Sequence, residues 1–125
     1  MKLTNKQIVN SIASLKNLSS KELDVKASFI IAKNIKAIDE ISDIFISEKM
    51  KLVNKFGTKD KDGNLKIDDN GAVEIAKDNL KEWNRSLSEL LEIENNIDIK
   101  TININDLDVK ISAQELLAIE FMFEE

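Results

Sequence analysis

The stretch that decides the fold is Leu23–Phe56, LDVKASFIIAKNIKAIDEISDIFISEKMKLVNKF, which contains neither Gly nor Pro. Its apolar side chains recur at mostly helical spacing. They are Ala27, Ile31, Ile35, Ile38, Ile41, Phe45, Leu52 and Phe56. Lysines crowd its end, where they complement the negative pole of a helix, and Gly57 is a natural residue to stop it. The pattern predicts a helix over Leu23–Phe56, with a break near Ile41–Ser47 as the alternative.

A helix of this length raises the question of what covers its apolar stripe. It would be roughly 50 Å long, whereas a compact domain of this size has a radius of gyration of about 14 Å. The middle of the stripe should therefore be exposed in a monomer, and a second copy of the chain is the expected cover. We predict a homodimer or higher homo-oligomer with an interface formed by Ile38, Ile41, Ile44 and Phe45.

The segments around this helix complete the predicted fold. Thr4 and Gln7 have the spacing of a capping box that opens a first short helix, and Ser112 and Glu115 have it before a terminal helix over ELLAIEFMF. A third helix is predicted over 77–92, with an apolar seam of Ala76, Leu80, Trp83, Leu87 and Leu90. The segment 95–109, with alternating isoleucines at 97, 99, 102 and 104, predicts one strand or two short ones. The expected fold class is mainly α with a small β element (α+β), in a single domain over 1–125.

The segment KDKDGNLKIDDNG, Lys59–Gly71, resembles a calcium-binding loop at first sight. In the register that starts at Asp60, oxygen ligands stand at loop positions 1, 3 and 5. However, Leu65 replaces the glycine of position 6, and Gly71 replaces the bidentate glutamate of position 12. The Asp-Gly and Asn-Gly pairs instead predict turns. We expect a hairpin of Leu65–Ile67 against Val73–Ile75, and no metal.

Composition narrows the function classes. The 125 residues include no Cys and no His, so thiolate nucleophiles, zinc–thiolate sites and imidazole bases are excluded. We therefore expect that this protein is not an enzyme and that it binds no cofactor. The net charge is −5, which is atypical of a nucleic-acid-binding protein. No apolar run is long enough to cross a bilayer and no signal peptide is recognisable, so we expect a cytoplasmic protein.

The three residues Trp83, Asn84 and Arg85 form the one candidate small-molecule site. The chain has no other Trp and no other Arg. An indole stacks on bases, and a guanidinium binds phosphate through a fork of donors. The alternative is that Trp83 belongs to the apolar seam and packs in the core. Successive residues of a helix also point about 100° apart, so the three do not share one face.

Three segments, Val25–Glu40, Lys55–Asn64 and Ser112–Glu125, together resemble a family of small, uncharacterised proteins from phages and prophages of Gram-positive bacteria. The resemblance implies a phage origin and brings no catalytic residues. Members often carry Pro where this chain has Asp24, which supports a helix start there. We expect a non-enzymatic binding protein, such as a counter-defence factor that binds a host immune protein or signal. The alternatives are a virion, tail-region or assembly protein, and a protein that sequesters a nucleotide ligand through Trp83 and Arg85.

Overall fold

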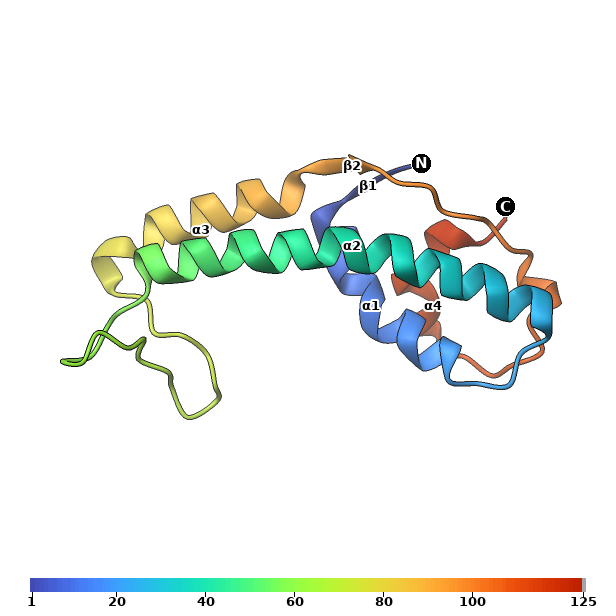
Figure 1. Cartoon of the computed structure of the whole chain (residues 1–125), viewed down its shortest axis with the longest axis horizontal. Coiled ribbons are helices and arrows are strands. Elements are labelled where there is room, and N and C mark those ends of the chain that lie inside the picture. The colour runs from blue at the N-terminus through green and yellow to red at the C-terminus, as the bar shows by residue number, and fades with distance from the viewer. Residues whose placement is uncertain (125) are drawn as a thin grey trace. The chain divides into compact units, whose positions relative to one another are not determined.

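A computed structural model describes residues 1–124 and shows a mainly helical chain with a small β element, as predicted (Figure 1). The elements in chain order are β1 (Lys2–Thr4), α1 (Asn5–Ser19), α2 (Val25–Phe56), α3 (Lys77–Glu92), β2 (Glu94–Asn96), η1 (Ile104–Asp106), α4 (Ala113–Ala118) and η2 (Glu120–Met122). The two η elements are single 3-10 turns. The long helix predicted from the first stretch is therefore confirmed as α2.

The chain divides into two compact units. Unit 1 consists of Met1–Ser42 and the chain from Glu94 onward, and unit 2 is Asp43–Ile93. The division falls inside α2, in the ISDIFIS segment where the sequence left a break open. Because α2 contributes to both units, the single domain expected from the length stays a prediction.

Local side-chain bonds set the starts of the first two helices. The Thr4 hydroxyl accepts from the Gln7 backbone at 3.1 Å, and the Gln7 side chain accepts from the Thr4 backbone at 2.9 Å. This is the predicted capping box. The Asp24 carboxylate accepts from the Ala27 backbone at 2.8 Å, so α2 begins at Val25, two residues after the predicted start.

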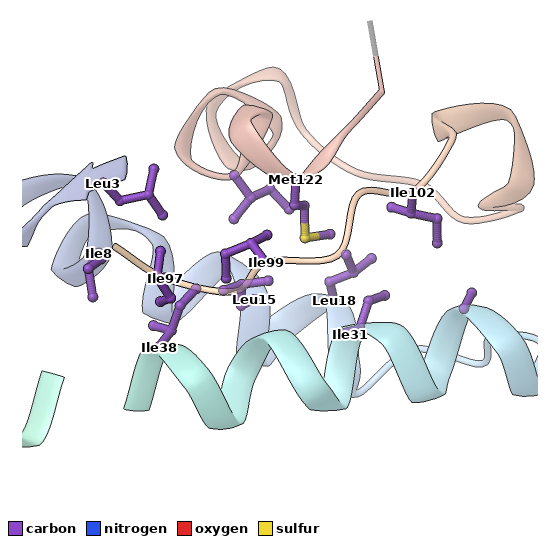
Figure 2. Packing of buried hydrophobic residues seen from close by; sticks show 12 residues of the cluster. Leu3, Ile8, Leu15, Leu18, Ile31, Ile38, Ile97, Ile99, Ile102 and Met122 are labelled. Carbon is purple, nitrogen blue, oxygen red and sulfur yellow. The ribbon is translucent and has the colours of Figure 1, made fainter. Parts of the chain in front are cut away.

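The core of unit 1 forms where α1, the first part of α2 and the C-terminal segment meet. Figure 2 shows isoleucine and leucine side chains of these segments pointing toward one another, with Met122 above them. The buried cluster comprises Leu3, Ile8, Leu15, Leu18, Ala27, Ile31, Ile38, Ile97, Ile99, Ile102, Ile119 and Met122. Burying each of the larger side chains contributes roughly 1.5–3 kcal/mol, which makes this cluster the main stabilising feature of the unit.

One polar residue, Asn34, lies completely buried on the same stripe of α2. Its Nδ2 donates to the Lys100 carbonyl at 2.9 Å, and its Oδ1 accepts from the Lys100 backbone N–H at 2.9 Å. The side chain thus satisfies one backbone donor and one acceptor, as a neighbouring strand would do. This pair of bonds ties the extended segment around Lys100 to α2.

The strand predicted within 95–109 is confirmed at its start, where β2 includes Asn95 and Asn96, but is wrong beyond it, where Ile102 forms only a single bridge. The β element is a short antiparallel pair of β1 and β2, with Leu3 opposite Asn95. Ile97 and Ile99 alternate with exposed residues, so the predicted pattern of burial is present without a ladder. The reason is that Asn34, and not a second strand, pairs with the backbone of Lys100.

The terminal helix is shorter than predicted. Ser112 caps α4 by accepting from the Glu115 backbone at 3.1 Å, but α4 ends at Ala118. Beyond η2, the Ile102 N–H donates to the Met122 carbonyl at 2.8 Å, and the Glu124 N–H donates to the Ile102 carbonyl at 2.9 Å. This parallel bridge of Ile102 with Phe123 requires extended backbone, which a continued helix could not supply.

Candidate functional site

Unit 2 is built from the second part of α2, a turn segment and α3. Phe45, Val53 and Phe56 are its buried apolar residues within the described chain, and all three lie on α2. The Asn79 side chain donates to the carbonyl of Phe56 at 3.4 Å, which fixes the start of α3 to the end of α2. In contrast, α3 itself contains no buried residue.

A turn module, residues 57–75, joins α2 to α3. Three short segments centred on Thr58, Lys66 and Glu74 pair with one another in a closed ring. The Lys66 N–H donates to the Thr58 carbonyl at 2.8 Å, the Glu74 N–H donates to Lys66 at 2.9 Å, and the Thr58 N–H donates to Glu74 at 2.9 Å. Each segment therefore binds both others, so the backbone groups at the centre are satisfied without a regular sheet.

The two turns of the module are copies of each other. The Asp60 carboxylate accepts from the backbone of Asp62 at 2.8 Å and of Asn64 at 3.0 Å. Eight residues later, Asp68 accepts from the second and fourth residues after it at 2.9 and 3.0 Å. Gly63 and Gly71 occupy equivalent places at φ of 83° and 82°. These bonds confirm the turns, because each aspartate oxygen closes its own loop.

The predicted hairpin is incomplete as a description of this module. Its pairing is present as a single bridge between Ile67 and Val73. The sequence interpretation missed the third segment, since Gly57 bridges Ile75 and Lys59 bridges Leu65. The spacing of eight between the two Asp-x-x-Gly turns was the signal that would have revealed a repeated unit.

Gly57 ends α2 for a reason that differs from the predicted one. It does not have a positive φ. Instead, a Cβ at this position would lie 2.5 Å from the Val53 carbonyl oxygen, 2.7 Å from Leu65 Cδ2 and 3.0 Å from Val73 Cγ1. The glycine is needed because the other two segments of the turn module pack directly onto its backbone.

The candidate site of unit 2 is a groove of about 510 Å³ between the second part of α2 and α3. Leu52, Leu90 and Ile93 give it apolar walls, and Glu48, Lys51, Ser86 and Glu89 form its polar rim. Lys51 Nζ lies 2.8 Å from Glu48 Oε1, so an ion pair between residues one helical turn apart forms this edge of the rim. An apolar groove with charged edges is typical of a site for an amphipathic segment.

The apolar seam predicted for α3 is only partly covered. Trp83, Leu87 and Leu90 are half-buried and Leu80 is exposed. The exposed large apolar residues of unit 2 also include Ile44, Ile46 and Met50 on α2. Accessible apolar side chains that line one groove, as Leu90 and Ile93 do, mark an interaction site more often than single scattered residues do.

The structure does not bring the predicted ligand residues together. Trp83 is half-buried, whereas Asn84 and Arg85 are exposed on other faces of α3. The Arg85 Nε lies 3.4 Å from Glu89 Oε1, and both side chains are largely in solvent. None of the three lines the groove. A nucleotide site at Trp83, Asn84 and Arg85 therefore stays a prediction, with no shared surface to support it.

The predicted oligomer interface was expected to be exposed, and this is wrong for three of its four residues. Ile38 is 1% exposed and belongs to the core of unit 1, and Ile41 packs against the same core. Phe45 is 6% exposed. Ile44 alone is open to solvent. Ile38 and Ile41 are covered from within the chain because the C-terminal segment, with Ile97, Ile99 and Met122, packs over the first part of α2 (Figure 2).

Residues 1–124 contain no group of three or more Asp or Glu side chains placed to share a metal ion. Within the same residues, no helix is long and apolar enough to cross a membrane. No family model, no curated protein and no solved structure matches the chain.

Proposed function

We propose that this chain is a phage-encoded, non-enzymatic binding protein whose unit 2 takes an apolar segment of a partner protein. The groove between α2 and α3 carries the proposal. It places Leu52, Leu90 and Ile93 beside one another, at a surface where α3 has no buried residue. An amphipathic helix binds such a groove with its apolar side, while its flanking charges meet the rim.

The charges of the rim indicate the character of the partner. Glu48 is paired with Lys51, and Glu89 is paired with Arg85, so both acids have a neighbouring base. A partner with isolated strong charge of either sign would gain little from such a balanced rim. The groove therefore suits a segment with two or three large apolar side chains and a mixed polar face.

Counter-defence is the biological role that we propose for this binding. It rests on the resemblance of Val25–Glu40, Lys55–Asn64 and Ser112–Glu125 to small proteins of phages that infect Gram-positive bacteria. Such a protein would act in the cytoplasm of the host, by occupying a surface of a host immune protein. Occupying a surface requires no catalytic residue, in agreement with a chain that lacks His and Cys.

Site-specific photocrosslinking tests the groove. A photoreactive phenylalanine analogue at Ile93, which lines the groove and is half exposed, should crosslink to one dominant host protein. The matched control carries the analogue at Ile67, an exposed isoleucine of the turn module outside the groove. Equal crosslinking from both positions, or none from Ile93, would exclude the groove as the binding site.

Phage genetics separates counter-defence from a role in the virion. An Ile93→Glu variant should reduce plating only on hosts that carry the targeted defence system, and plate normally on a host without it. A virion or assembly protein would instead lower the burst size on every host. The Ile67→Glu phage is the control, since it adds the same charge at an exposed isoleucine outside the groove.

A further inference from the structure

The outer side of α2 in unit 1 is unusually apolar at its start. Val25 is 86% exposed and Phe29 is 64% exposed. At 100° per residue, both lie opposite the buried stripe that contains Ala27, Ile31 and Asn34. No residue of unit 1 up to Glu124 covers them, although together they present two large apolar groups one turn apart.

Two lysines follow Phe29 along α2. Lys33 Nζ lies 5.6 Å from the centre of the Phe29 ring, and Lys36 follows on the same side of the helix. Lys33 and Lys36, with Lys100, line a small hollow whose acids are Glu40 and Asp98. We call Val25, Phe29, Lys33 and Lys36 the basic knob.

Unit 1 also has a hollow with the opposite character. It measures about 640 Å³ and is lined by α1 and by the segment that runs from α4 through η2. Leu117, Phe121 and Phe123 supply apolar surface, and Glu120 and Glu124 supply charge. No Lys or Arg among residues 1–124 lines it. Leu117 is 67% exposed, so an apolar side chain stands open at this acidic hollow.

We propose that the basic knob of one copy of the chain inserts into the acidic hollow of a second copy. Phe29 would pack against Leu117 and Phe121, while Lys33 and Lys36 would approach Glu120 and Glu124. The volume of the hollow lies within the range of sites that enclose a ligand, and one aromatic ring with its flanking atoms fits inside it. Each chain carries both halves of the contact, so no other protein is needed.

The charges on the knob and on the hollow favour a second copy of the chain over an unrelated partner. Lys33 lies over the Phe29 ring and Lys36 follows on the same side of α2, whereas the hollow carries two glutamates and no base in the described chain. The acids near the start of α2, Asp24 and Asp106, line a different hollow on the side of Ala27 and Ile30. Glu40 and Asp98 are the acids beside Lys33 and Lys36, but Lys100 lines the same hollow, so bases outnumber acids there.

The positions of the knob and the hollow determine which assemblies this contact can form. The knob lies on α2 and the hollow is lined by α1, α4 and η2, so the two surfaces share no residue. Two copies can therefore insert their knobs into each other's hollows as a two-fold dimer, or each copy can bind the next in a closed ring or open filament. This arrangement differs from the dimer through Ile38, Ile41, Ile44 and Phe45 that the sequence predicts.

Complementary variants test the proposal. Phe29→Glu removes the knob and leaves the hollow, and Leu117→Lys disables the hollow and leaves the knob. By light scattering, the native chain should be larger than its 14.1 kDa monomer at about 100 µM, and each variant should be a monomer. An equimolar mixture of the two variants should form a dimer of twice the chain mass, because one intact knob and one intact hollow remain. Each single substitution should weaken association at least about tenfold, or 1.4 kcal/mol.

Ile67→Glu serves as the control, since this exposed isoleucine lies in unit 2, and it should assemble like the native chain. Far-ultraviolet circular dichroism confirms that each variant is folded. The proposal is overturned if the native chain is a monomer at about 100 µM, or if the mixed variants fail to associate. It is also overturned if Phe29→Glu abolishes capture of a host protein by a monomeric native chain, because the knob would then serve another partner.

Discussion

The two units of this chain bury their apolar side chains in different ways. Unit 1 buries residues from four segments in one cluster and fixes its irregular backbone with the side chain of Asn34. In the described chain unit 2 buries the apolar residues Phe45, Val53 and Phe56, all from α2, whereas α3 has no buried residue. Local stability follows the density of buried apolar contacts, so we expect unit 2 to open at a lower free energy than unit 1.

This difference in burial indicates which unit carries a surface for binding a partner. A surface that binds a partner must keep apolar groups accessible, which lowers the stability of the unit that carries it. Unit 2 meets this condition through its groove. The chain also provides a convenient probe, because its one Trp, Trp83, lies on α3 and its fluorescence reports on unit 2. Circular dichroism reports on the helices of both units.

The largest expected effect comes from a cavity in the core of unit 1. Ile31→Ala removes a completely buried side chain and should lower the free energy of unfolding by about 2–5 kcal/mol. Leu87→Ala on α3, where the leucine is only half-buried, should cost less than half of that. Urea unfolding followed by circular dichroism and by Trp83 fluorescence measures both. Equal losses for the two variants would contradict the contrast between the units.

The next effect concerns the polar clamp of unit 1. Asn34→Leu should lower the free energy of unfolding by about 1–3 kcal/mol, because it removes the hydrogen-bond partner of the Lys100 N–H and of the Lys100 carbonyl. Amide exchange at Lys100 and its neighbours should accelerate more than exchange elsewhere. Asn17→Ala is the control, since Asn17 also bonds a distant residue, Glu115, but at an exposed position. If both variants behave alike, the buried clamp has no special role.

An effect of similar size or smaller distinguishes Gly57 from the other two glycines of unit 2. Gly57→Ala should cost about 1–3 kcal/mol, because its Cβ would lie 2.5 Å from the Val53 carbonyl oxygen. Gly63→Ala and Gly71→Ala meet no atom within 4 Å, and should cost about 1–2 kcal/mol through their positive φ alone. Asparagine tolerates positive φ, so Gly63→Asn should recover stability while Gly57→Asn should not. Recovery at Gly57 would show that its crowding is absent. Trp83 fluorescence during urea unfolding provides the measurement.

The smallest effect has the opposite sign. The Thr58 hydroxyl is buried in the turn module without a hydrogen-bond partner in the described chain. Thr58→Val replaces it with a methyl group of similar size and should stabilise unit 2 by about 0.5–1 kcal/mol. Thr101→Val, at an exposed position of unit 1, should be neutral. A loss of stability in Thr58→Val would mean that the hydroxyl has a bound water or another partner. Thermal unfolding followed at Trp83 resolves the change.

Much of the local structure could be predicted because its causes lie within a few residues. The capping box of Thr4 and Gln7, the cap at Ser112 and the turns at Gly63 and Gly71 all depend on short-range bonds. The helices over Val25–Phe56 and Lys77–Glu92 followed from periodicity. Of the candidate site, the sequence indicated the apolar seam of α3 but not the groove, since Leu52 and Ile93 are far apart in the chain.

What the sequence by itself determined is therefore the set of helices, their caps and the places where the chain turns. Only the tertiary structure decided that Ile38 and Phe45 are covered within the chain while Ile44 and Phe29 remain open. It also decided that the segment around Lys100 pairs with a side chain of α2 and that three segments of the turn module close into a ring. The physical reason is that periodicity identifies an apolar face, but burial depends on which distant segment packs against that face.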